Sequence, residues 1–163
     1  MLRRMVATPM KKSNLLVAHM TSRLSMNFLE ALILVIFARY YFDLKIQGSL
    51  LALFLVFIAG NIAFTGIALL FSSRTSKTEI GNALINLVTM PMMILGGIFF
   101  SYQNFPEWTI PFIEKLPLTM MADSFRSIIN EGAGMKDVMD NILFLGTGGI
   151  LTFFAGVKIF KWY

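Results

Sequence analysis

Long apolar stretches alternate with short polar ones along this chain, and four of them have the length of a membrane-spanning helix. Such a helix needs about 20 mostly apolar residues between polar flanks. The chain carries such stretches at about residues 15–38, 48–71, 80–100 and 139–160. The third contains Pro91, which removes one helix hydrogen bond and is expected to kink the helix. The pattern predicts an all-α integral membrane protein with four transmembrane helices.

The stretch between the third and fourth spans, residues 101–138, has a different character. Three prolines divide it into pieces that are too short to span a bilayer, namely Pro106, Pro111 and Pro117. Residues 118–130 are expected to form a short helix that the following glycines end. Apolar stretches of about 10–14 residues are typical of re-entrant or interfacial helices. We therefore expect an extracytoplasmic, re-entrant helical segment between the third and fourth transmembrane helices.

The composition excludes a water-soluble protein of this size. Of the 163 residues, 56% are hydrophobic and 14% are charged, whereas typical soluble domains have about 45–50% and about 25%. A chain of this length predicts one domain, and one domain could not bury so much apolar surface in water. A cytosolic enzyme, a nucleic-acid-binding domain and a disordered chain are therefore excluded. The net charge of +5 is expected to come from an excess of Lys and Arg in cytoplasmic loops.

The distribution of charge predicts the orientation of the helices. Lys and Arg collect in the cytoplasmic loops of membrane proteins. Basic residues outnumber acids on the side that holds both ends of the chain, whereas acids outnumber bases on the side that holds residues 101–138. Both termini are therefore expected in the cytoplasm, with residues 101–138 outside. The bases on the cytoplasmic side are Arg3, Arg4, Lys11, Lys12, Arg74, Lys77, Lys158 and Lys161.

Polar residues inside the first span lie on one helical face, because their spacing follows the turn of an α-helix. They are His19, Arg23, Asn27 and Glu30. A polar stripe in lipid is costly, so this face should meet protein or water. The interpretation we favour is a helix–helix or subunit interface in which Glu30 is paired. The alternative is a translocation path or a proton-linked site at Glu30.

The second and third spans also carry polar residues at helical spacing. Asn61 and Thr65 lie on the second span, and Asn82, Asn86 and Thr89 lie on the third. Asn and Thr side chains within a bilayer commonly form hydrogen bonds between helices, at about 0.6 kcal/mol each. We favour this structural role for them. The alternative is a weakly polar lining for an amphipathic substrate.

Catalytic chemistry is not expected in this chain. It has no P-loop motif G-x-x-x-x-G-K-[ST], no H-E-x-x-H motif, no cysteine and a single histidine, His19. These absences exclude nucleotide binding by a P-loop, a thiolate metal site and the commonest zinc sites. We expect no catalytic residue, no metal and no cofactor bound by the chain itself.

The first 13 residues form a basic segment around Thr8 and Pro9. Its bases are Arg3, Arg4, Lys11 and Lys12. Taken alone, a basic segment beside a span is typical of binding to anionic lipid, at about 1 kcal/mol for each base.

Several motifs follow one another in a specific order along the chain. The run L-R-R-M-V-A-T-P-M-K-K-S-N-L-L occupies residues 2–16. Later motifs are G-G-I-F-F-S at 96–101, F-P-E-W at 105–108, L-P-L-T at 116–119, Arg126 and G-A-G at 132–134. In this order and spacing they resemble the cytoplasmic coupling segment and the C-terminal signature of ABC-2-type ABC transporter permeases. The resemblance covers essentially the whole chain.

The resemblance implies a permease subunit of an ATP-driven exporter, which forms part of the translocation path and docks a separate ATPase subunit. That partner would bind and hydrolyse ATP. A second permease copy or homologue would enclose the path, in a prokaryotic cytoplasmic (inner) membrane. The coupling residues would be Arg3, Arg4, Thr8, Pro9, Lys11 and Lys12, and the outer gate segment would include Phe105, Pro106, Trp108, Pro117 and Arg126.

The resemblance departs at the start of the chain. Permeases of this family have six spans, with the coupling segment between the second and the third, whereas this chain begins at that segment. We therefore expect residues 1–163 to be a partial permease domain, which is a truncated reading frame, a fragment, or half of a split permease. In the last case a two-span N-terminal fragment would complete it. Two other hypotheses stay open: a small proton-coupled multidrug-type exporter that uses Glu30, and a non-transporting membrane scaffold subunit.

Overall fold

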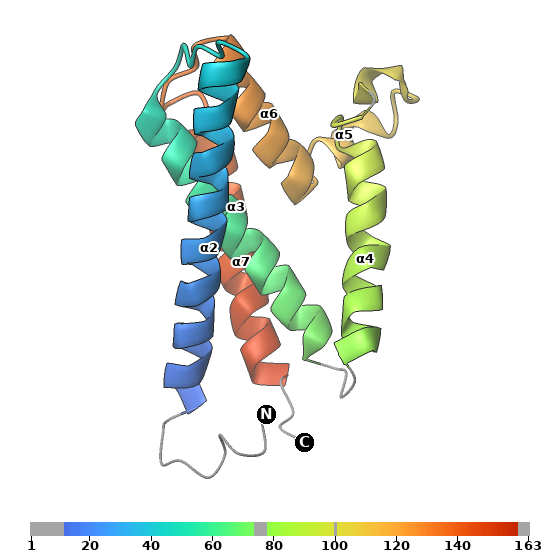
Figure 1. The fold of residues 1–163 in the computed structure, drawn as a ribbon. Helices are drawn as coiled ribbons and strands as arrows, with labels where there is room; N and C mark the ends of the chain where they lie inside the picture. Colours follow the sequence, from blue (N-terminus) through green and yellow to red (C-terminus); the bar gives the residue numbers. More distant parts are fainter. Residues whose placement is uncertain (1–11, 74–77, 100, 160–163) are drawn as a thin grey trace. The chain divides into compact units, whose positions relative to one another are not determined.

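The computed structural model of the chain describes residues 12–73, 78–99 and 101–159, and within these ranges every regular element is a helix. The prediction of an all-helical protein is confirmed for them, and the chain divides into two compact units, Met1–Lys45 and Ile46–Tyr163. In chain order the elements are α2 (Lys12–Tyr41), α3 (Leu50–Ser72), α4 (Thr78–Leu95), the 3-10 helix η1 (Tyr102–Asn104), α5 (Ile110–Ile113), α6 (Pro117–Asn130) and α7 (Met139–Ile159), as Figure 1 shows.

The first unit is built on α2, which is apolar over most of its length. The side chains of Thr21–Tyr41 are largely exposed, as expected for a helix that meets lipid rather than a protein core. The helix ends where the Phe42 N–H donates to the Ala38 carbonyl oxygen at 3.1 Å. Asp43 then adopts a left-handed φ of 48°, and its carboxylate lies 3.7 Å from the Arg39 guanidinium.

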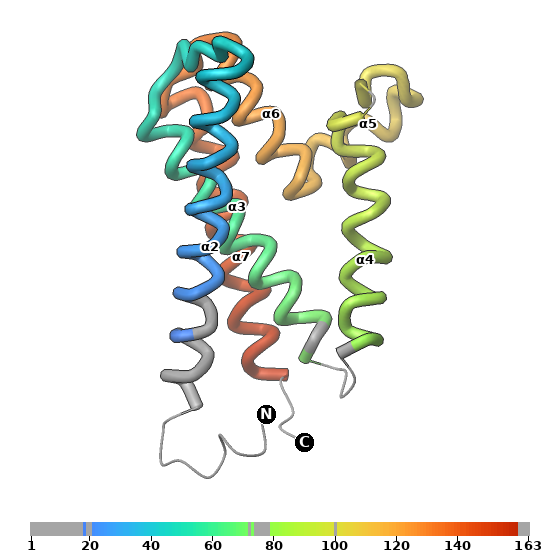
Figure 2. Tube along the Cα trace, in the orientation of Figure 1, coloured from blue at the N-terminus to red at the C-terminus, as the bar shows by residue number. Residues whose placement is uncertain are grey.

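Helices α3 and α7 make the most extensive contact in the second unit, and glycines bring their backbones together (Figures 1 and 2). A Cβ atom at Gly149 would lie 2.6 Å from Ala63 N, and one at Gly156 would lie 3.0 Å from Leu70 N. A Cβ atom at Gly66 would collide with the carbonyl oxygen of Gly149. Small residues allow this kind of close packing between helices in a bilayer. The contact leaves no room for a side chain at the three glycines.

Helix α6 packs along the N-terminal half of α3 and runs in the opposite direction. Its Ile128 is fully buried with Ala52 and Val56, near the start of α3. Its Met121 lies against Gly60, at the middle of α3. The C-terminal end of α6 is therefore beside the beginning of α3, and the N-terminal end of α6 is beside its middle.

The loop that precedes α3 is hydrogen-bonded to the end of α6. The Gly48 N–H donates to the Ile128 carbonyl oxygen at 2.9 Å, and the Gln47 N–H donates to that of Ile129 at 3.3 Å. The last carbonyl groups of a helix have no partner within it, so these bonds satisfy the C-terminal end of α6. Glycine is required at position 48, because a Cβ atom there would lie 2.5 Å from the Ala133 carbonyl oxygen.

Helix α4 ends at Leu95, whereas the uncharged run that predicted the third span continues to residue 100. The reason is the pair of glycines that follows. Gly97 has a left-handed φ of 72°, a conformation that glycine adopts without strain and that ends helices. Pro91 lies inside α4, which continues past it to Leu95.

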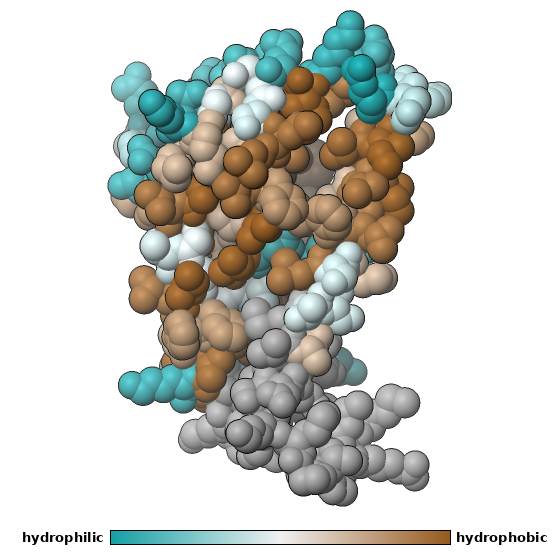
Figure 3. All heavy atoms as spheres, turned by 90° about the vertical axis from the view of Figure 1, so that its left-hand side faces the viewer, coloured by the Kyte–Doolittle hydropathy of each residue, from teal (hydrophilic) through white to brown (hydrophobic). Residues whose placement is uncertain are grey.

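Three helices among the described residues are long and apolar enough to cross a membrane: Thr21–Tyr41, Leu50–Phe71 and Met139–Ile159. Glu79–Leu95, within α4, is a shorter apolar helix. On the face that Figure 3 presents, apolar side chains form a broad area below hydrophilic side chains at the upper edge. These features are those of a multi-pass membrane protein. A fourth span at α4 and a re-entrant position for residues 101–138 stay predictions.

Substituting Gly149 with alanine should weaken the α3–α7 pair, because the new Cβ atom would meet backbone atoms of α3. We expect the free energy of unfolding in detergent to fall by about 1–3 kcal/mol, the usual cost of overpacking. The matched control is Gly146→Ala, since a Cβ atom at Gly146 meets nothing within 4 Å and alanine favours a helix over glycine. Denaturant titration followed by circular dichroism measures both variants. Equal stability of the two would contradict the close contact.

Candidate functional site

The candidate site is the junction that α6 makes with the helices around it. Pro117 stands at the first position of α6, where its missing N–H costs nothing. The Met120 N–H donates to the Leu116 carbonyl oxygen at 3.0 Å and closes the first turn. At the other end Gly132 has a left-handed φ of 73°, which turns the chain away from the helix. Pro117 therefore marks the start of α6, and Gly132 lies just beyond its end.

Two charged residues of α6 bind the segment that follows α4. The Arg126 guanidinium donates to the Gly97 carbonyl oxygen at 3.0 Å and to the Asp123 carboxylate at 2.8 Å. The second carboxylate oxygen of Asp123 accepts a hydrogen bond from the Tyr102 hydroxyl at 2.9 Å. We call these four residues (Gly97, Tyr102, Asp123 and Arg126) the clamp. It fastens the chain on both sides of residues 98–101 to a single face of α6.

A second polar contact joins α6 to α7. The Ser124 side chain is fully buried, and its hydroxyl donates to the Met120 carbonyl oxygen at 2.6 Å. The Asn141 side-chain amide, in the first turn of α7, donates to the Ser124 hydroxyl oxygen at 2.9 Å. Buried polar groups that are hydrogen-bonded in this way specify one packing arrangement. The contact fixes the register between α6 and α7.

Thr119 is the exception among the buried polar side chains of the described residues. Its side chain is 0% exposed, and its hydroxyl has no hydrogen-bond partner within the part of the chain that the structure describes. The oxygen lies 3.3 Å from the position of a Cβ atom at Gly96. Thr119 therefore sits where the N-terminal end of α6 meets the C-terminal end of α4.

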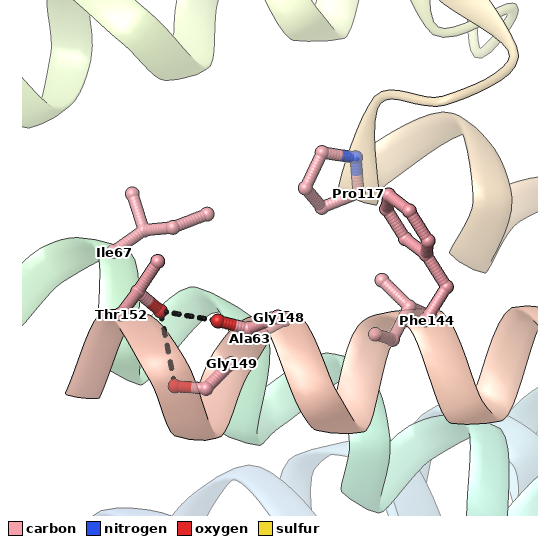
Figure 4. Close-up of a pocket in the computed structure, with 8 residues that line it drawn as sticks. Ala63, Ile67, Pro117, Phe144, Gly148, Gly149 and Thr152 are labelled. Carbon is pink, nitrogen blue, oxygen red and sulfur yellow. Dashed lines mark hydrogen bonds between the residues drawn. The ribbon is translucent and has the colours of Figure 1, made fainter. Parts of the chain in front are cut away.

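A pocket of about 100 Å³ lies between α3, α7 and the first residue of α6. Figure 4 shows Pro117 and Phe144 on one side of the pocket, and Ile67 and Thr152 on the other. The Thr152 hydroxyl is bound to its own helix, at 2.9 Å from the Gly148 and 3.0 Å from the Gly149 carbonyl oxygen. The pocket therefore suits an apolar group. Its lining residues are Ala63, Ile67, Pro117, Phe144, Leu145, Gly148, Gly149 and Thr152.

The residues expected to couple the chain to an ATPase fall almost entirely outside the described residues. Those outside are Arg3, Arg4, Thr8, Pro9 and Lys11, and Lys12 is the first residue of α2. The coupling role of this segment stays a prediction.

The polar residues expected to line a path or an interface are spread over three helices. Arg23, Asn27 and Glu30 have exposed side chains on α2, and the ion pairs among the described residues do not include Glu30. Asn61 on α3 is half-buried and donates to the Phe57 carbonyl oxygen of its own helix at 2.9 Å. Thr65 is also half-buried on α3, and Asn86 is exposed on α4. The path or interface role of these residues is untested.

The residues expected in an outer gate segment divide into two groups. Pro117 begins α6 and lines the pocket, and Arg126 belongs to the clamp. Phe105, Pro106 and Trp108 lie between η1 and α5, where Trp108 is 74% exposed. Sequence reasoning did not include Tyr102, Asp123, Ser124 or Asn141 in the candidate site, and Thr119 entered it only as the last residue of the motif at 116–119. The spacing of Asp123 and Arg126 within an expected helix was the one available signal, because residues three apart are neighbours on a helix.

The pKa of Tyr102 is raised to about 12, mainly by burial and then by the hydrogen bond to Asp123. The negative charges of Asp123 and Glu114 contribute to this rise, whereas the positive charge of Arg126 opposes it. Ionisation of the phenol would remove the proton that Tyr102 donates to Asp123 and would place two negative charges together. The neutral phenol is therefore part of the intact clamp.

Comparison with known proteins gives two matches. Over residues 1–130 the chain matches the family described as ABC-2 type transporter. It is also 28% identical over 134 residues to ABC transporter G family member 20 of Dictyostelium discoideum. That match covers 81% of this chain and 18% of the relative, so the chain spans less than a fifth of the relative's length. No solved structure matches the chain.

The Tyr102 phenol provides a pH test of the clamp. An unfolded tyrosine has a pKa of about 10, and the folded value is about 12. The stabilisation by the neutral phenol is therefore complete below pH 10 and is lost as the pH rises through about 12. We expect the difference in ultraviolet absorbance between the wild type and Tyr102→Phe to titrate near pH 12.

Asp123→Asn should lower that midpoint only in part, because burial is the larger cause. The control is Glu107→Gln, which removes an exposed carboxylate that is not among the groups that shift the pKa of Tyr102. A midpoint that Asp123→Asn leaves unchanged would show that the hydrogen bond to Asp123 is absent in the folded protein.

Proposed function

The chain belongs to the ABC-2 type transporter family, and we propose that it is a permease subunit of an ATP-driven exporter that docks a separate ATPase subunit. The observation that carries this proposal is the family match over residues 1–130. The matched region contains the basic N-terminal segment, three apolar helices and the whole of α6. In this proposal the chain forms part of the translocation path and the partner hydrolyses ATP.

The arrangement of α6 supports a re-entrant position for it. The distribution of charge predicts that the loop before α3 lies on the outer side of the membrane. The C-terminal end of α6 is bonded to that loop, and its N-terminal end lies beside the middle of α3. Non-helical backbone at membrane depth is tolerated only where protein covers it or where it lines a water-filled cavity. In the proposed permease, α6 therefore enters from outside and lies near the exit of the path.

The polar faces of two helices support an assembly with further protein. Arg23, Asn27 and Glu30 on α2 and Asn86 on α4 have exposed side chains in the single chain. Ionisable and amide groups within a bilayer usually face protein or water. We therefore propose a second permease copy or homologue, with a two-span N-terminal part, as the partner of these faces. The path would lie between the two permeases.

The N-terminal coupling segment can be tested by charge reversal. Changing Arg3 and Arg4 together to Glu should weaken co-purification of the ATPase, because in this proposal the positive charge of the segment contributes to docking. The matched control reverses Lys115 and Lys136, two exposed bases on the side expected to face outward. Co-purification that is equal in the two double variants would limit the N-terminal segment to a lipid-binding role.

Glu30 distinguishes the ATP-driven exporter from a proton-coupled one. Glu30→Gln keeps the size and most of the hydrogen-bonding capacity of the side chain but cannot titrate. In an ATP-driven permease, where Glu30 belongs to an interface, export from membrane vesicles with ATP should stay near the wild-type rate. Loss of nearly all transport in this variant, together with transport driven by a proton gradient in the wild type, would instead favour the proton-coupled exporter.

A further inference from the structure

We propose that the C-terminal end of α4 has two positions relative to α6, and that the clamp residues Arg126, Asp123 and Tyr102 hold the closed one. The inference rests on the proposed permease function and names the element that would move at the outer end of the path. Three features of the junction carry it: a missing helix hydrogen bond at Pro91, one turn before the end of α4, a small set of bonds that fastens this end to α6, and a buried hydroxyl that has no partner among the described residues.

A proline within α4 and two glycines after it favour movement of the C-terminal end of this helix. Pro91 has no N–H, so the Leu87 carbonyl oxygen lacks its usual partner within the helix. The helix stops at Leu95 and is followed by Gly96 and Gly97, the second in a left-handed conformation with a φ of 72°. Glycines lose the most conformational freedom when they are held in place. The last turn of α4, which the Gly96 N–H closes by donating to the Met92 carbonyl oxygen at 2.7 Å, therefore lies between a missing helix hydrogen bond and a pair of glycines.

The clamp compensates for this weakness with charge-assisted hydrogen bonds. One nitrogen of Arg126 binds the Gly97 carbonyl oxygen at 3.0 Å, and another binds Asp123 at 2.8 Å. Asp123 in turn accepts the bond from Tyr102 at 2.9 Å. The Arg126 side chain is 46% exposed, so water competes with these bonds and keeps their net strength modest. A modest clamp can open during a transport cycle.

The Thr119 hydroxyl favours the open position, in which the end of α4 has moved away from α6. Its hydroxyl is completely buried beside Gly96 and has no partner among the described residues. A buried hydroxyl without a hydrogen bond destabilises the state that contains it. If the end of α4 left α6, this hydroxyl would meet water and regain its hydrogen bonds. The closed position therefore combines a stabilising clamp with a destabilising contact, which is the condition for two positions of similar free energy.

The test uses Thr119→Cys, which is the only thiol in the variant because the natural chain has no cysteine. The protein is tested as the full chain in membranes together with its ATPase, and modification by N-ethylmaleimide is followed by intact mass. We expect slow labelling in the closed state. Adding Arg126→Gln should accelerate it by about three- to fivefold, because the bonds of a half-exposed arginine have a modest net effect on an equilibrium.

Two controls make the result specific. Arg39→Gln removes an arginine whose ion-pair partner is Asp43, outside the clamp, and should leave the labelling of Thr119→Cys unchanged. Val138→Cys places the thiol in the core that Ile128 of α6 shares with α3. This thiol should stay protected when Arg126→Gln is added. Acceleration at position 119 alone therefore supports movement at the α4 side of α6.

Two results would overturn the proposal: labelling of Thr119→Cys that Arg126→Gln does not change, and equal acceleration at positions 119 and 138. The second would mean that α6 loosens as a whole. The effect of ATP on the labelling rate tests the proposed permease function separately. ATP should raise the labelling rate of Thr119→Cys in a working permease. Acceleration by Arg126→Gln without any effect of ATP would contradict the permease function but would leave the two positions of α4 supported.

Discussion

The hydrogen-bonding needs of an interrupted backbone constrain the whole second unit. The last carbonyl groups of a helix have no partner within it, so a helix end that other segments cover needs hydrogen bonds from those segments. At the C-terminal end of α6, Ile128 and Ile129 carbonyl oxygens accept bonds from Gly48 and Gln47. These bonds place α6 beside the start of α3. The pocket, the clamp and the contact with α7 all depend on that placement.

Close helix packing supplies the support on which α6 rests. Gly149 and Gly156 allow the backbone of α7 to touch that of α3, and this pair presents a continuous surface to α6. Apolar side chains fill the contact, with Ile128 and Val56 fully buried. Polar bonds then select the register, through Ser124 toward α7 and through Arg126 toward the end of α4. Van der Waals packing thus holds the helices together, and a few hydrogen bonds decide how they fit.

Local patterns in the sequence predicted most of the helices but not the junction. Residues 118–130 were expected as a helix because proline and glycine bracket them, and α6 covers Pro117–Asn130. The third span was expected to continue to residue 100 because it lacks charge, but Gly96 and Gly97 end the helix at Leu95. Hydropathy alone does not report such a stop.

The polar contacts of the junction join residues that are far apart along the chain. Arg126 binds the Gly97 carbonyl oxygen, and Ser124 binds Asn141. Neither pair has a local signature, because each forms only after α6 has packed against its neighbours. The N-terminal coupling residues are a different case, since residues 1–11 lie outside the described part of the chain. Their assignment rests on the family resemblance.

The central claim is that α6 lies along α3 from its start to its middle. A disulfide between Gly60→Cys and Met121→Cys, formed by mild oxidation in membranes, tests it most directly. The Met121 Cγ atom lies 3.3 Å from the Cβ position at Gly60, so a cysteine pair there has the reach of a disulfide. The reference pair is Gly146→Cys with Met121→Cys, since a Cβ atom at Gly146 meets nothing within 4 Å. We predict that the first pair forms a disulfide and that the reference pair does not. Absence of a disulfide in the first pair, or equal formation in both pairs, would contradict the claim.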